Sequence, residues 1–317
     1  MIELESLSKI YHSDKGAPVN AVQDLDLCVP TGQICGLIGP SGAGKTTVLE
    51  IVAGLEPLTA GRIRLNGYDL DGEREMAMRQ LGAVIDGGRG LQETLPVWEN
   101  MARCERARST QAQRERVLRE LDLWPHRGDT VGQLSQGTKR LVAVACALIA
   151  EPPILLLDEP TQYLDTLAAR RVKAQIRQLA HEKGTAVLLT TRRPRVAQAL
   201  CDRVVVIRQG RAVADRPISE LDDLIRGEHY QIRIKGELDS SRSEWLGGLS
   251  LAAESAEQAG TILSCVVADQ AALHGLLAKI RDLGIPLLSA TRVEPGLNAV
   301  LAHLMFMPLN ELEIKSN

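Results

Sequence analysis

Three short apolar runs occur in the first two thirds of the chain. They cover residues 34–38, 154–157 and 186–189, and none shows the polar–apolar alternation of a half-exposed strand. Continuous apolar runs of this length are typical of strands buried on both faces of a parallel sheet. Four segments between or after them have helical character: 46–53, 97–122 with a break near Ser109, 139–150 and 165–183. Strands alternating with helices predict an α/β fold whose parallel sheet is covered on both faces.

A second group of strands is predicted around this sheet. Residues 2–10 and 19–29 partly alternate in polarity and flank a polar loop, as in paired strands. Tyr11 follows the first of them, and in itself predicts only ordinary strand packing. Further short strands are predicted at 62–65, 82–85, 204–207 and 211–214, the last two as a hairpin around Gln209-Gly210.

The composition shifts after residues 226–228, which predicts a second domain. Strands are expected at 229–235, 249–254, 261–267 and 286–292, a helix at 269–283, a helix or loop at 240–247 and a short helix at 296–305. This order suggests a small α+β sandwich of the ferredoxin-like kind, with a structural or regulatory role. We therefore divide the 317 residues into a main domain (1–225), a small domain (226–306) and a tail (307–317).

The composition argues against a nucleic-acid partner. The formal net charge is −3 and aromatic residues make up 3%, whereas nucleic-acid binders usually carry a basic surface and stacking rings. The basic segment 103–119 is interpreted as a solvated helix face. Six scattered cysteines without close pairs indicate a reducing compartment and no metal site. No signal peptide or membrane-length apolar run is evident, so we expect a cytosolic protein that would need a partner for any membrane role.

The clearest motif follows the first buried run. Gly39, four residues, Gly44, Lys45 and Thr46 form the pattern of a phosphate-binding loop, placed between a predicted strand and a predicted helix. Its backbone N–H groups would face phosphate oxygens, Lys45 would reach the β- and γ-phosphates, and the Thr46 hydroxyl would ligate Mg²⁺. The expected nucleotide-binding residues here are Gly39, Pro40, Ser41, Gly42, Ala43, Gly44, Lys45, Thr46 and Thr47. The alternative is a glycine-rich turn without a ligand.

Two further polar segments contain candidate site residues. Asp158 ends a buried strand and suits a second Mg²⁺ ligand, while Glu159 is placed to accept a proton from an attacking water. Ligands of such sheets bind at the carboxyl ends of the strands. Ser135 and Gly137 precede a helix and suit a second anion site, which could serve the nucleotide of another copy. The alternatives are a loop that caps a helix at 158–160 and a plain helix N-cap at Ser135.

Taken together, these motifs resemble those of the ATP-binding-cassette (ABC) ATPases. The matching residues are Tyr11, 39–47, Leu134-Ser135-Gln136-Gly137, 154–160, Leu164-Asp165 and Thr190-Thr191, and the resemblance spans about residues 1–220. It implies a P-loop NTPase fold: a RecA-like core, an antiparallel β-subdomain and a helical subdomain around residues 90–150. In that family two cassettes sandwich two ATP molecules head to tail.

The resemblance also assigns roles by matching position. Tyr11 would stack on adenine, Ser135 and Gly137 would contact the ATP of the opposite subunit, and the helical subdomain with the loop at residue 86 would contact a membrane permease. The C-terminal extension, ending in residues 293–297, resembles that of drug-exporter-type cassettes.

Three positions depart from the family pattern. Asp86 stands where a glutamine is expected; its carboxylate can ligate Mg²⁺ but adds negative charge. Arg192 stands where a histidine is expected; it can bind the γ-phosphate but cannot shuttle protons. These two changes would offset each other in charge. Gln162-Tyr163 replaces a small residue and a glycine, which would alter contacts across the dimer. We therefore expect secure binding and slow turnover.

The sequence thus predicts the ATP-binding subunit of a transporter, with export favoured over import, acting as a dimer at the cytoplasmic face of a membrane through a separate permease. Its ATPase would use Glu159, Lys45 and Arg192, with Mg²⁺ held by Thr46, Asp158 and Asp86. Two alternatives remain open. One is a partly degenerate subunit that supports an active paralogue. The other is a non-transport ABC switch protein, although the sequence shows neither a second cassette nor a coiled-coil insertion.

Overall fold

The computed structural model describes residues 1–13, 16–85, 90–104, 110–220, 228–235, 250–253, 260–267 and 270–292. The chain divides into two compact units, Met1–Ala212 and Val213–Asn317. The dividing point falls inside a strand of the main sheet, so the predicted domain boundary at 225/226 stays a prediction.

A six-stranded sheet forms the centre of the first unit. Its strands lie in the order β10-β9-β3-β8-β7-β6. All pairs from β9 to β6 are parallel, and β9 and β10 are joined by the short turn at Gln209-Gly210. The bounds are β3 Ile34–Ile38, β6 Leu81–Val84, β7 Ile154–Asp158, β8 Ala186–Thr191, β9 Arg203–Arg208 and β10 Arg211–Pro217. The predicted parallel sheet of buried strands is confirmed, since every residue of β3 and β8 is buried.

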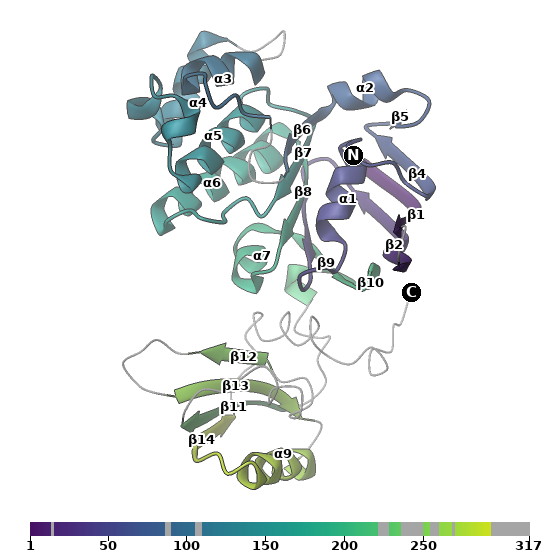
Figure 1. Cartoon of the computed structure of the whole chain (residues 1–317), viewed down its shortest axis with the longest axis vertical. Coiled ribbons are helices and arrows are strands. Elements are labelled where there is room, and N and C mark those ends of the chain that lie inside the picture. Colours follow the sequence, from purple (N-terminus) through teal and green to yellow (C-terminus); the bar gives the residue numbers. More distant parts are fainter. Residues whose placement is uncertain are drawn as a thin grey trace. The chain divides into compact units, whose positions relative to one another are not determined.

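An antiparallel sheet packs on one side of this core. Its order is β2-β1-β4-β5, with bounds β1 Ile2–Ser13, β2 Gly16–Val29, β4 Ala60–Leu65 and β5 Tyr68–Asp69. Helix α1 (Lys45–Val52) lies between the two sheets (Figure 1) and shares one hydrophobic core with both. This places the start of α1, and therefore the loop before it, in a rigid setting.

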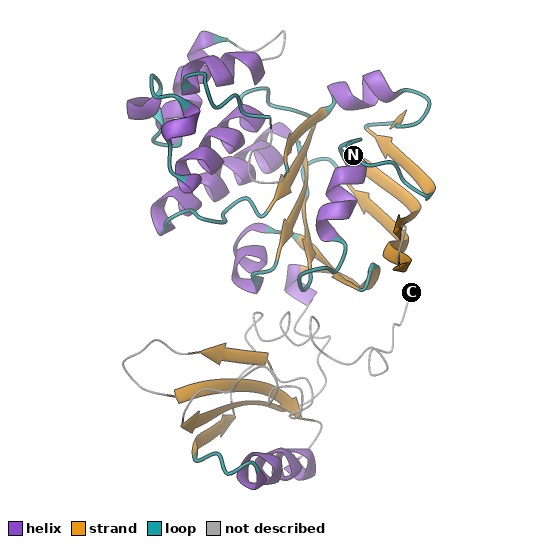
Figure 2. Cartoon of the chain, in the orientation of Figure 1, coloured by secondary structure: helices purple, strands orange, loops and turns teal. Residues whose placement is uncertain are grey.

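Helices occupy the other side of the parallel sheet (Figure 2). They are α3 Val97–Cys104, α4 Gln111–Glu120, α5 Gln136–Leu148 and α6 Thr166–Lys183. Asp165 caps α6, its Oδ1 accepting from the Ala168 N–H at 2.8 Å, and Gly184 ends the helix with φ 74°. Both predicted caps are confirmed. Two short helices, α2 (Arg74–Arg79) and α7 (Pro194–Leu200), were not expected from the sequence. In the described part of the chain, every helix is too short or too polar to cross a bilayer.

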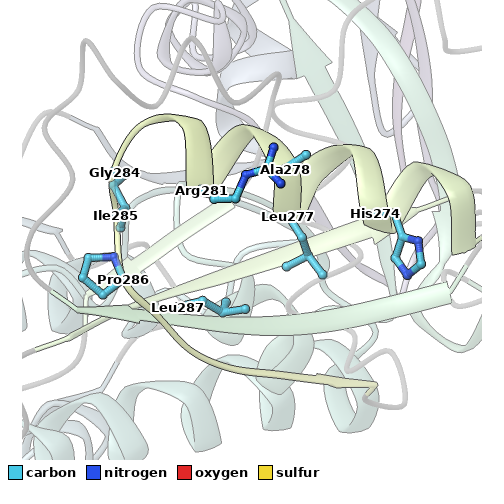
Figure 3. A pocket seen from close by; sticks show the side chains of 8 residues that line it. All are labelled: His274, Leu277, Ala278, Arg281, Gly284, Ile285, Pro286 and Leu287. Atoms are coloured by element: carbon cyan, nitrogen blue, oxygen red, sulfur yellow. The ribbon is translucent and has the colours of Figure 1, made fainter.

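The second unit contains a four-stranded antiparallel sheet and one described helix. The strand order is β12-β13-β11-β14, with β11 Glu228–Lys235, β12 Ser250–Ala253, β13 Gly260–Val267 and β14 Leu287–Arg292. Helix α9 (Gln270–Asp282) packs on it through Leu273, Leu276 and Ile280. Beside α9 and the start of β14 lies a groove of about 570 Å³ (Figure 3), mostly apolar, whose ionisable lining residues are His274 and Arg281. The segments predicted at 240–247, 296–305 and 307–317 lie outside the described residues.

Candidate functional site

The phosphate-binding loop connects β3 to α1, as predicted. A Cβ on Gly39 would lie 2.1 Å from the carbonyl oxygen of Ile207, and one on Gly44 would lie 2.2 Å from that of Ala21. Gly44 also has φ 101°, a backbone conformation open to glycine at little cost. The loop is therefore held against the backbones of β9 and β2. Gly39 has no left-handed φ, so glycine is required there by close packing and not by backbone conformation. The sequence motif alone does not reveal this reason.

Lys45 is buried at the base of this loop. Its Nζ donates to the carbonyl oxygens of Gly39 at 2.8 Å and Pro40 at 2.7 Å. Burial lowers the pKa of Lys45, the carboxylate of Glu159 acts in the opposite direction, and the guanidinium of Arg192 adds to the lowering. A partly desolvated ammonium group beside the backbone N–H groups of the loop is suited to bind an anion.

Two oxygen ligands converge beside the loop. The Thr46 hydroxyl donates to the Asp158 carboxylate, with Oγ1 3.3 Å from Oδ1 and 3.4 Å from Oδ2. The Thr190 hydroxyl also donates to Asp158 Oδ1 and so orients this carboxylate. A hydroxyl and a carboxylate next to a phosphate-binding loop fit Mg²⁺, which usually takes one or two protein oxygens and completes its shell with phosphate and water. Thr46 and Asp158 are thus positioned to hold the ion.

Glu159 is a buried acid of the site whose carboxylate is held on both oxygens. Only 9% of the residue is exposed, and its φ is 46°. Its Oε2 accepts from the Thr191 hydroxyl at 3.2 Å, and its Oε1 accepts from the Arg192 backbone N–H at 2.7 Å. Because a non-glycine residue in this conformation is strained, the surrounding contacts must fix it. They hold the carboxylate at the carboxyl end of the sheet, where the sequence predicts a general base.

Arg192 connects the acid to the phosphate-binding loop. Its Nε lies 3.4 Å from Glu159 Oε1, and its Nη1 donates to the Ser41 hydroxyl at 3.1 Å. The side chain is half exposed. The structure thus brings Arg192 to Glu159 and Ser41, as a phosphate-binding role for this arginine requires.

Arg140 is a residue of the site that the sequence did not reveal. It lies on α5, is 3% exposed, and its Nη2 donates to the backbone carbonyl oxygens of Asp158 at 2.8 Å and Glu159 at 2.9 Å. These bonds tie the helix that follows Ser135 to the backbone that carries both site carboxylates. The available signal was a charged residue directly before the long apolar stretch of this helix.

Ser135 and Gly137 lie in a separate groove of about 440 Å³ at the start of α5, which is also lined by Tyr163, Leu164 and Asp165. Ser135 caps α5, its Oγ accepting from the Thr138 N–H at 3.1 Å. The groove lining includes no residue of the phosphate-binding loop. Within the described residues of one chain, therefore, these two motifs do not form one site.

Two predicted site residues remain, Tyr11 and Asp86. Tyr11 is near the end of β1, 36% exposed, with the Lys9 ammonium 4.7 Å from its ring centroid. Asp86 lies outside the described residues, so its predicted contact with Mg²⁺ stays a prediction.

Comparison with known proteins agrees with this geometry. A family model described as ABC transporter matches residues 22–162, and one for a domain of unknown function, DUF8691, matches residues 229–291. The chain is similar to the daunorubicin resistance ATP-binding protein DrrA3 of Streptomyces coeruleorubidus, with 32% identity over 96% of this chain and 95% of that protein. It is similar to the methionine import ATP-binding protein MetN 1 of Bacillus cereus, with 35% identity over 70% of this chain and 66% of that protein.

A solved structure, the dimeric bacterial ABC transporter cassette MJ0796, has a TM-score of 0.63 and 25% identity, covering 68% of this chain and 98% of its own. With a phosphate-binding loop, a carboxylate pair at the end of β7 and relatives similar over most of its length, the chain belongs to the ABC transporter family as an ATP-binding subunit.

Proposed function

We propose that the protein is a Mg²⁺-dependent ATPase that drives export through a separate membrane permease. The single observation that carries the ATPase activity is the junction of Lys45, Asp158, Glu159 and Arg192 beside the phosphate-binding loop, with Arg192 joining Glu159 to Ser41.

The proposed chemistry follows from these contacts. Lys45 binds the β- and γ-phosphates, and the backbone N–H groups of the loop between Gly39 and Thr47, which Pro40 lacks, hold the remaining phosphate oxygens. Thr46, Asp158 and Asp86 would hold Mg²⁺, which would supply positive charge against the phosphates. Glu159 orients the attacking water and accepts its proton. Tyr11 stacks on the adenine ring through the ring face opposite Lys9.

Arg192 takes part at the γ-phosphate. Its guanidinium offers several N–H donors in a fixed plane, and a γ-phosphate beside Ser41 would lie within reach of them. Moving toward the phosphate would release Glu159 Oε1 from the Nε contact at 3.4 Å. Because arginine stays protonated, it contributes charge but no proton transfer. We infer slower turnover than in cassettes with histidine here.

The test of the base is a comparison of wild type with Glu159→Gln. We expect Glu159→Gln to bind ATP with similar affinity and to lose hydrolysis by at least about 100-fold, since general-base catalysis contributes about that much or more. Glu182→Gln, the same chemical change at an exposed position near the end of α6, serves as the matched control and should hydrolyse ATP like wild type. Equal, non-zero hydrolysis rates for wild type and Glu159→Gln would rule out Glu159 as the base.

The role of Arg192 has its own test. Arg192→His should raise the turnover number if the arginine slows the cycle, whereas Arg192→Ala should weaken ATP binding by removing the cation beside Ser41. A turnover number that is unchanged or lower in Arg192→His would indicate that the arginine is fitted to this site and does not act as a brake.

The export direction rests on the extent of similarity. The relative named for daunorubicin resistance is similar over 96% of this chain, which includes the second unit, and the relative named for methionine import over 70%. We place the protein at the cytoplasmic face of a membrane, bound to its permease through the helical subdomain. Co-purification from membranes of the native organism, with identification of a polytopic partner, tests this; binding to ribosomes or nucleic acid instead would favour an ABC switch protein.

A degenerate subunit is the second alternative. In that case the purified protein would bind ATP but would hydrolyse it only after a paralogous cassette is added. The intact Lys45, Asp158 and Glu159 contacts favour an active subunit.

A further inference from the structure

Arg140 is a buried cation next to the residue proposed as the general base. It lies at the start of the second turn of α5, and only 3% of the residue is exposed. Burial of a guanidinium group is costly unless strong hydrogen bonds replace its water. Here a single nitrogen atom, Nη2, donates to the backbone carbonyl oxygens of both Asp158 and Glu159. The chain therefore places a buried charge on the backbone that carries the base.

The peptide group before Glu159 is held at both of its polar atoms. Its carbonyl oxygen, which belongs to Asp158, accepts from Arg140 Nη2 at 2.8 Å. Its N–H, which belongs to Glu159, donates to the backbone carbonyl oxygen of Thr190 at 3.2 Å. This peptide group is thus fixed between α5 on one side and β8 on the other.

The peptide group after Glu159 offers fewer places at which it can be held. The next residue is Pro160, which has no backbone N–H, so the carbonyl oxygen of Glu159 is the polar atom by which this group can be fixed. That oxygen accepts from Arg140 Nη2 at 2.9 Å and from the Gln162 N–H at 3.0 Å. Arg140 therefore takes part in fixing both peptide groups that flank the Cα atom of Glu159.

These two bonds act on a strained backbone. Glu159 has φ 46°, which costs free energy for a residue with a side chain and persists only where the surroundings impose it. Rotation of either flanking peptide group would change the φ or ψ of Glu159, turn its Cα–Cβ bond and displace the carboxylate. The Thr191 hydroxyl and the Arg192 backbone N–H hold the far end of the side chain, whereas Arg140 holds the backbone from which it starts.

We propose that Arg140 is a positioning residue for ATP hydrolysis, which imposes the backbone conformation at Glu159 and so directs the carboxylate toward the attacking water. The proposal rests on the proposed function, because it takes Glu159 as the base. Arg140 acts on the base through the backbone. Its loss therefore lowers the rate of hydrolysis, while nucleotide binding, which uses Lys45 and the phosphate-binding loop, stays close to that of wild type.

The first test compares Arg140→Met and Arg140→Lys in the full chain, with kcat and KM for ATP measured separately. Arg140→Met should lower kcat by at least about tenfold, since a misplacement of about 1 Å can cost about 100-fold. Its KM should stay within about threefold of wild type. Arg140→Lys should recover most of the loss, because one nitrogen makes both bonds and a lysine ammonium group has three N–H donors. Arg170→Met, at an exposed position of α6, is the matched control and should hydrolyse ATP like wild type.

The second test separates positioning of the base from a purely structural role. Arg140→Met is combined with Glu159→Gln, and the residual hydrolysis is measured in single-turnover assays. If Arg140 acts through Glu159, it should lower this residual rate by less than about twofold, because residues that act as a unit are not additive. Binding of a fluorescent ATP analogue shows that each variant is folded. If Arg140→Met does not fold, Arg140→Lys takes its place, and its smaller loss should likewise disappear in Glu159→Gln.

Three results would overturn the proposal. They are a wild-type kcat in Arg140→Met, a lysine variant as slow as the methionine variant, and an equal fractional loss of hydrolysis with and without Glu159→Gln. Full hydrolysis by Glu159→Gln alone would instead refute the proposed function, since that variant leaves Arg140 in place.

Discussion

Replacement of Gly39 by alanine should damage this protein through packing. The added methyl carbon would lie 2.1 Å from the carbonyl oxygen of Ile207, although Cβ atoms essentially never approach other atoms within 3.0 Å. Either the loop or β9 must therefore move by about 1 Å. Strand β9 cannot yield easily, because Ile207 is 1% exposed and the strand is hydrogen-bonded on both sides.

The expected size follows from that displacement. Overpacking of a buried site costs about 1–3 kcal/mol of folding free energy. A shift of about 1 Å in groups that position a substrate lowers rates by on the order of 100-fold. We therefore expect Gly39→Ala to lower kcat/KM for ATP by about that factor, with a lower midpoint of urea unfolding.

Steady-state ATPase assays and urea titrations would check both numbers. Gly72→Ala is the matched control, because a Cβ there meets no atom within 4 Å and the residue has no left-handed φ. It should match wild type in both assays. If Gly39→Ala had the kcat/KM and stability of wild type, the loop could move away from Ile207 without loss, and the packing explanation would be wrong.

Three further predictions concern single residues. Asp165→Ala should lower the free energy of unfolding by about 1 kcal/mol through loss of a helix N-cap, and Asp165→Asn should restore most of it in urea titrations; equal stability of all three would contradict the cap. Burial lowers the pKa of Lys45 in the folded chain below its ordinary 10.5. At pH values between the lowered pKa and 10.5, the unfolded chain therefore binds more protons than the folded chain, and stability rises with pH. Wild type should therefore gain stability relative to Lys45→Met as pH approaches 10.5, and a constant difference would refute this. Burial raises the pKa of the Cys201 thiol well above its ordinary range, whereas Cys28 is exposed; iodoacetamide at about pH 8 should modify Cys28 far faster in the native protein, as mass spectrometry can check, and equal rates would contradict the burial.

Two cysteines that are far apart in the sequence lie close together in the folded chain. The sequence shows them scattered, yet the folded chain brings Cys104, at the end of α3, into a hydrogen bond with Cys146 of α5. This contact lowers the pKa of Cys104 and raises that of Cys146. The proximity of these two distant residues depends on the packing of two helices, so spacing in the sequence could not reveal it.

Several features of this protein could be predicted from its sequence, because they depend on residues that are adjacent in the chain. A strand that is apolar on both faces has no side suited to water, so the continuous apolar runs predicted buried parallel strands. The α6 caps followed from Asp165 and Gly184, because capping depends only on adjacent backbone groups. The phosphate-binding loop was recognisable for the same reason, since its function rests on consecutive residues.

Other features depended on tertiary structure. The need for glycine at residue 39 comes from the carbonyl group of Ile207, which is far away in sequence. The bonds of Arg140 to the backbone of Asp158 and Glu159, and of Arg192 to Ser41, likewise join segments that only the folded sheet brings together. The motif spacing located the phosphate loop and the acid pair. The packing of distant backbones and side chains determined how Glu159 is held.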